Sequence, residues 1–190
     1  MAKEIVYEIK DNYKKFEELF KKEKIINDNI IILKEKGSNK DWLLGDSSIQ
    51  IETDSKDILF IAEKKKLDNK YGLKYRCESF YKKPYFRFDS DGPAHRNYIE
   101  NIPLEEQKIT TPHFNTYNKD GISIAYKNEI LKDDEKAKII AEDINFGVSL
   151  FCQETNSKTI NDEFPQIILN ETTLDFNYQE MINLDNLTFE

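Results

Sequence analysis

The chain has 190 residues, which predicts one domain, and its 12% of aromatic residues can fill one core although only 38% of the residues are hydrophobic. The formal net charge of -8 argues against nucleic-acid binding by overall charge and leaves that role to a local basic patch. The N-terminus shows no signal-peptide pattern and no apolar run approaches the roughly 20 residues of a membrane span, so we expect a cytoplasmic protein with no membrane partner.

The first expected element is a helix over residues 11–26. Apolar residues recur there at helical spacing, and Asp11 or Asn12 can cap its start. Its lysines are expected on a solvated face. The apolar positions are Tyr13, Phe16, Leu19 and Phe20.

Between Trp42 and Phe88 the pattern changes to period two, which is typical of strands. Short polar turns join these runs and favour an antiparallel meander. A further hairpin is predicted where residues 113–117 and 122–127 flank the turn sequence NKDG.

Residues 133–154 predict a long amphipathic helix. Asp133, Asp134 and Glu135 suit the positive end of its dipole. Its apolar stripe consists of Ala137, Ile140, Ala141, Ile144, Val148, Phe151 and Cys152.

The order of the elements predicts an α+β fold: an antiparallel β-sheet meander with an N-terminal helix and the long amphipathic helix packed on one face. We expect a single α+β domain over residues 1–158. No Lys or Arg follows Lys158, so residues 159–190 form an acidic C-terminal segment that we expect to dock on the domain.

Familiar cofactor and metal signatures are absent from the sequence. The six glycines form neither a dinucleotide fingerprint nor a phosphate loop, and there is no Cys-x-x-Cys, His-Glu-x-x-His or Gly-x-Ser-x-Gly. Cys77 and Cys152 are too few for a disulfide framework and are interpreted as reduced core thiols. We therefore expect no cofactor.

The only two histidines, His95 and His113, lie in one short stretch, each near a proline. Gly92 and Pro93 predict a tight turn directly after a strand, so that His95, Arg96 and Asn97 project from a loop at the strand end. The second histidine follows Pro112 at the start of the next strand. Such histidines can also serve only as turn or hydrogen-bonding residues.

Alternation predicts which face of the sheet each side chain occupies. If Phe114 joins Phe86 and Phe88 in the core under the long helix, then His113 shares the opposite face with its neighbours on both strands. These neighbours are Asn115 and Tyr117 on its own strand, and Tyr85, Arg87 and Asp89 on the preceding one. We expect the side chains of the two histidines about 4–8 Å apart, because an acid and a base must reach one group.

These residue types suit the cleavage of a phosphodiester. His113 and His95 would serve as general acid and base, and Arg96 as the phosphate clamp. Asp89, Asn115 and Tyr117 would orient them, while Arg87 and Asn97 would bind the substrate. Asp89, His95 and His113 could also supply three metal ligands, but their spacing is not diagnostic, and we expect no metal.

The residues of this region also form two motifs, which read Asp89, Gly92-Pro93-x-His95-Arg96-Asn97 and Pro112-His113-x-Asn115-x-Tyr117. They resemble an uncharacterised domain family of bacteria and mobile elements, whose members carry Gly-Pro-x-His-Arg-Asn and Pro-His-x-His-x-Tyr. The resemblance covers roughly residues 40–170, including the helix ending LFCQETN. It implies a genuine site at His95 and His113 and assigns no activity. Asn115 replaces the family's second histidine, and this departure implies a weakened or inactive site if the family uses that pair.

Two functions follow from these observations. The first is a small nuclease-like phosphodiesterase that uses the His pair on nucleic acid or a nucleotide, in phage–host conflict. The alternative is a non-catalytic protein-binding module, such as a phage-encoded inhibitor of a defence enzyme. Asn115 favours the alternative, and so does the acidic C-terminal segment, which could bind a basic protein partner.

Overall fold

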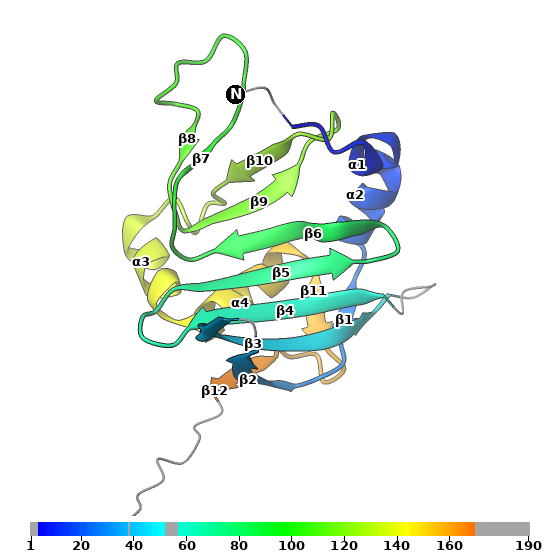
Figure 1. Cartoon of the computed structure of the whole chain (residues 1–190), viewed down its shortest axis with the longest axis vertical. Coiled ribbons are helices and arrows are strands. Elements are labelled where there is room, and N and C mark those ends of the chain that lie inside the picture. Colours follow the sequence, from blue (N-terminus) through cyan, green and yellow to red (C-terminus); the bar gives the residue numbers. More distant parts are fainter. Residues whose placement is uncertain (1–3, 38, 52–56, 170–190) are drawn as a thin grey trace, which may run out of the picture.

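The computed structural model describes residues 4–37, 39–51 and 57–169. The chain forms an α+β structure around a large, mainly antiparallel sheet (Figure 1). Its centre is an antiparallel run in which each strand pairs with the next one named. The strands of this run are β3 (Asn39–Gln50), β4 (Ile58–Lys65), β5 (Tyr71–Cys77), β6 (Tyr81–Asp89), β9 (His113–Tyr117) and β10 (Ser123–Tyr126).

Four short strands extend the sheet beyond the expected meander. Strands β1 (Lys24–Ile26) and β2 (Ile30–Lys36) pair antiparallel with β3, and each has a parallel partner from the C-terminal part of the described chain. These partners are β11 (Ser157–Thr159) for β1 and β12 (Gln166–Leu169) for β2. The expected boundary at residue 158 thus falls inside β11, while residues 170–190 lie outside the described residues.

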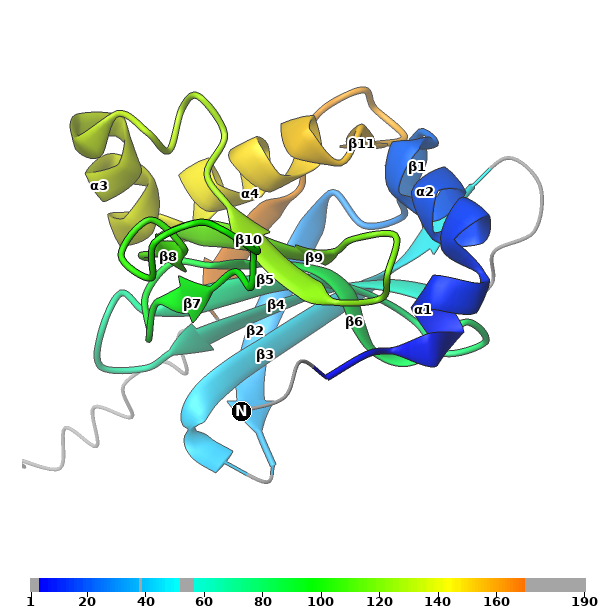
Figure 2. The same ribbon diagram turned by 90° about the horizontal axis from the view of Figure 1, so that it is seen from above.

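The expected long helix is two helices. Helix α3 (Asp134–Glu142) ends where Asp143 adopts an extended backbone with ψ 116°, and α4 (Ile144–Glu154) begins directly after it. The Asp143 carboxylate accepts a hydrogen bond from the Asn145 N–H at 2.7 Å, so Asp143 is an N-cap within the apolar stripe. Both helices lie on the same side of the sheet (Figure 2).

The N-terminal helix is also divided, into α1 (Tyr7–Asp11) and α2 (Tyr13–Lys21). One lysine in the segment expected to be helical, residues 11–26, does not face solvent. Lys24 is fully buried, and its ammonium donates hydrogen bonds of 2.7–2.8 Å to the carbonyls of Phe20, Lys22 and Thr155. Burial lowers the pKa of Lys24 to about 7. The lysine joins the ends of α2 and α4 instead of facing water.

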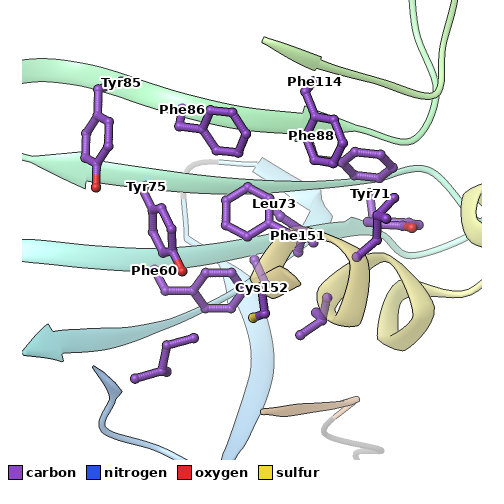
Figure 3. Close-up of a cluster of buried hydrophobic side chains, with 14 of the residues drawn as sticks. Phe60, Tyr71, Leu73, Tyr75, Tyr85, Phe86, Phe88, Phe114, Phe151 and Cys152 are labelled. Atoms are coloured by element: carbon purple, nitrogen blue, oxygen red, sulfur yellow. The ribbon is translucent and has the colours of Figure 1, made fainter. Parts of the chain in front are cut away.

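Aromatic side chains fill the core between the sheet and α4 (Figure 3). Phe86, Phe88 and Phe114 are buried, and the Phe86 ring lies 5.3 Å from that of Phe151 on α4. Gly147 allows α4 to approach the sheet, because a Cβ there would lie 2.1 Å from the Tyr71 hydroxyl oxygen. Ile140 on α3 and Ile144 and Val148 on α4 are buried as well.

Tyr85 departs from the expected alternation. We expected it beside Arg87 on the outer face, but it is fully buried and stacks on Tyr75 in the core. The β5–β6 register shifts between Tyr75 and Cys77, so Tyr85 and Phe86 are buried in succession. A β-bulge of this kind turns one side chain to the other face.

Cys77 and Cys152 are free and buried. Within the described residues, no helix is both long and apolar enough to cross a bilayer.

Candidate functional site

The pairing of β6 with β9 brings the candidate polar residues together. Arg87 lies opposite Asn115, and Asp89 lies opposite His113. The intervening pair, Phe88 with Phe114, points into the core. The four polar residues therefore share the face of the sheet that lies away from α4.

Asp89 is the centre of this cluster. Its Oδ2 atom accepts a hydrogen bond from Asn115 Nδ2 at 2.8 Å and lies 3.1 Å from Arg87 Nε. The same oxygen lies 3.7 Å from His113 Nε2. Asp89 is thus placed to orient both the histidine and the arginine.

The chain between β6 and β9 leaves the main sheet and forms a small antiparallel ladder of β7 (His95–Arg96) and β8 (Lys108–Ile109) (Figure 1). Gly92 begins this excursion with φ +149°, a conformation that favours glycine. The start of the excursion docks on β10, because His95 Nε2 lies 3.3 Å from the Ser123 carbonyl oxygen.

Asn97 completes the docking two residues further along. Its Nδ2 donates to the Ala125 carbonyl at 2.7 Å, and its Oδ1 accepts from the Ala125 N–H at 2.8 Å. Residues 95 and 97 thus bond to residues 123 and 125, with the same two-residue spacing on both sides. This arrangement holds His95 over the outer face of β9.

The result is a pair of histidines whose ring centroids are 6.4 Å apart, with ring planes at 73°. His113 is buried, and His95 is partly buried. This separation falls within the expected 4–8 Å, and both residues line one surface pocket of about 290 Å³.

Arg87 and Asp89 line the same pocket, as do Lys70 and Asp91, which were not among the expected site residues. The Lys70 ammonium lies 3.9 Å from the Asp91 carboxylate. The β5–β6 register could have revealed them, because the pairing of Gly72 with Asp89, continued by two residues, places Lys70 opposite Asp91.

Burial lowers the pKa of both histidines. For His95, the Ser123 carbonyl opposes this shift and the Arg87 charge adds to it. For His113, the Asp89 carboxylate opposes the shift, while His95 and Arg87 add to it. Both imidazoles are therefore mostly neutral at pH 7 in the free protein, and each can act as a base.

Three expected site residues lie elsewhere. The Arg96 guanidinium stacks 4.8 Å from the Tyr98 ring centroid, and its Nε donates to Gln107 at 3.4 Å. Tyr117 lies at the other end of β9, with its hydroxyl 3.3 Å from that of Tyr81. Asn97 uses both its polar groups on Ala125. Arg87 and Lys70 supply the positive charge in the pocket that we expected from Arg96.

The possible metal set Asp89, His95 and His113 does not form a metal-binding group. Among the residues that the structure describes, no three His, Cys, Asp or Glu side chains are arranged to hold a metal ion.

Replacing Asn97 with alanine should lower the free energy of unfolding by about 1–3 kcal/mol, since it leaves the Ala125 N–H and carbonyl without partners. Chemical denaturation monitored by circular dichroism measures this loss. Asn97→Asp keeps the acceptor but places a carboxylate oxygen against the Ala125 carbonyl oxygen, so it should destabilise the protein as well. An Asn97→Ala protein as stable as the parent would refute the docking role.

Comparison of the chain with protein-family models, with curated proteins and with solved structures finds no match.

Proposed function

We propose that this protein is a phosphodiesterase that cleaves nucleic acid with the pair His95 and His113. The observation that carries the proposal is the 6.4 Å separation of two histidine rings on the wall of one pocket that also contains Arg87 and Lys70. Two imidazoles at this spacing can contact opposite sides of one phosphate, while the two cations bind its oxygens.

The proposed reaction is an in-line displacement at phosphorus. A neutral imidazole takes the proton of the attacking hydroxyl as the new O–P bond forms. A protonated imidazole gives its proton to the leaving oxygen as the old P–O bond breaks. Protons and charge balance, because one histidine gains the proton that the other loses.

The surroundings of the two rings suggest how these roles are divided. Asp89 favours the protonated form of His113, so we assign His113 as the acid. His95 can donate through Nε2 to the Ser123 carbonyl, which leaves its Nδ1 to accept a proton as the base. Asn115 holds Asp89 in place, as a positioning residue.

The test is incubation of the purified protein with single-stranded RNA and DNA oligonucleotides, with a chelator present in a parallel reaction. We expect cleavage of RNA, whose 2′-hydroxyl supplies the attacking group, to leave a 2′,3′-cyclic phosphate and a 5′-hydroxyl. Cleavage should persist with the chelator. Intact strands in every reaction would overturn the proposal.

The rate should depend on pH with a maximum below 6.5, the ordinary pKa of histidine. The acid must be protonated and the base neutral, so the maximum lies between two pKa values that burial has lowered. Above both pKa values the acid loses its proton and kcat/KM falls. A profile of kcat/KM against pH checks this, and a maximum at or above pH 7 contradicts it.

A second candidate is the protein-binding module. One observation favours it: the loop between β7 and β8 exposes Ile99 (52%) and Leu104 (58%) beside Glu105 and Glu106. An exposed apolar pair with adjacent acids suits a partner with an apolar, basic surface. The expected role of the acidic segment in such a complex stays a prediction, because most of it lies outside the described residues.

A further inference from the structure

The sheet has a second face that α3 and α4 do not cover (Figure 2). We infer that this face binds the phosphodiester chain of a single-stranded nucleic acid and leads it into the histidine pocket. The inference deepens the proposed function and rests on it for the fate of the bound strand. It names the surface that would hold a single-stranded polynucleotide outside the pocket.

Alternation shows which side chains occupy this face. On β4 and β5 the core positions are Ile58, Phe60, Ala62, Leu73 and Tyr75, so the residues between them point the other way. Cations outnumber acids there, although the whole chain has a net charge of -8. The cations are Lys34, Lys36, Lys65, Lys74, Arg76 and Arg87, and the acids are Asp46, Glu63 and Asp89, with Glu78 just after β5 paired to Arg76.

Two cations on this face lie directly opposite each other. Lys74 on β5 pairs with Arg87 on β6. Each cation also contacts a carboxylate, Glu63 for Lys74 and Asp89 for Arg87, and these carboxylates reduce the repulsion between the two like charges. A phosphate between Lys74 and Arg87 could contact both cations at once.

Lys36 and Lys74 are incompletely neutralised, whereas Arg76 and Arg87 are each paired with a carboxylate, Glu78 and Asp89. Glu63 is bonded to both Lys36 and Lys74, so two ammonium groups share one carboxylate. Lys36 therefore lies close to Lys74, and Lys74 lies beside Arg87. Because Arg87 also lines the histidine pocket, the three side chains form a continuous cationic track that ends at the site.

Apolar side chains between the cations favour a single-stranded nucleic acid over an acidic polypeptide. Ile61 pairs with Lys74, and Leu59 pairs with Arg76, and both apolar residues are partly exposed. Trp42, the only tryptophan, pairs with Lys65, whose N–H donates to the carbonyl of the pocket residue Lys70. A single strand can stack a base on the Trp42 ring and place others against the aliphatic side chains, while its phosphates contact the cations.

The test is fluorescence anisotropy with labelled single-stranded RNA and DNA about 12 nucleotides long, within the range of roughly 4–16 that single-strand-binding domains cover. The full chain carries His113→Ala so that the strand stays intact. Lys74→Gln and Lys36→Gln are compared with Lys138→Gln, the same change on α3. Circular dichroism verifies that each variant is folded.

We expect both strands to bind, because both carry the same phosphates. Lys74→Gln and Lys36→Gln should each lower the slope of log K against log salt by about 0.7, the value for one lost contact to a single strand. Lys138→Gln should leave the affinity and the slope unchanged. Equal behaviour of the three variants, or binding of poly-glutamate in place of the oligonucleotides, would overturn the inference.

The design separates this inference from the proposed function. If Lys74→Gln and Lys36→Gln weaken oligonucleotide binding but the unaltered protein cleaves no strand, the binding face is supported and the phosphodiesterase is refuted. If the protein cleaves RNA but Lys74→Gln and Lys36→Gln leave its affinity for the oligonucleotides unchanged, the binding face is refuted and the phosphodiesterase is not.

Discussion

Replacing His113 with alanine should reduce the rate of phosphodiester cleavage by about 10²–10⁴-fold, the usual contribution of a general acid or base. The ring is buried against the pocket and lies 6.4 Å from His95, and Asp89 is its nearest charged partner. Steady-state kinetics on an RNA oligonucleotide measures the effect. His95→Ala should cost a similar factor, and the double variant little more than either single variant, because the pair works as a unit.

A structural cause for this loss has to be separated from a chemical one. His113→Gln keeps most of the buried volume and a polar group, so its unfolding free energy should stay near that of the parent while its rate falls as far as that of His113→Ala. If both variants stay active, the phosphodiesterase proposal fails. In that case, loss of partner binding by Ile99→Asp and Leu104→Asp would support the protein-binding module.

Replacing Phe88 with alanine should lower the free energy of unfolding by about 3–5 kcal/mol. Its side chain is fully buried, with ring centroids 5.3 Å from Phe114 and 5.8 Å from Tyr71, so the change opens a cavity between the sheet and α4. Urea denaturation measures the loss. Phe146→Ala is the matched control, because that ring is 54% exposed and its removal should change the stability by less than about 0.5 kcal/mol. Equal effects at the two positions would contradict the core described above.

Period-two alternation was enough to predict that four of the candidate residues lie together. The apolar positions Phe86, Phe88 and Phe114 determine one face of β6 and β9, and the other face follows from the pleat. Arg87, Asp89, His113 and Asn115 therefore came together as expected. The same rule failed at Tyr85, because a bulge depends on the neighbouring strand and leaves little trace in its own strand's pattern.

Features that depend on distant partners could not be predicted from local pattern. Lys24 looks like a surface lysine in a charged segment, yet three carbonyls from two helix ends surround it. Arg96 is the phosphate clamp expected from the sequence, but Gln107 and Tyr98 hold its side chain away from the pocket. The break between α3 and α4 at Asp143 could have been predicted from the sequence. An aspartate can cap the start of a new helix by accepting a hydrogen bond from the N–H two residues later, here that of Asn145.

The parallel pairing of β1 with β11 and of β2 with β12 affects how the chain folds during its synthesis. Strands β1 and β2 complete their pairing only with β11 and β12, and the hydrogen bond from Lys24 to Thr155 spans 131 positions. At roughly 5–20 residues per second, a ribosome needs about 7–26 seconds to synthesise that interval. During this time the early strands expose unpaired edges, and such long-range contacts also slow folding. The nascent chain is therefore most open to aggregation and to chaperones before α4 and β11 have left the exit tunnel.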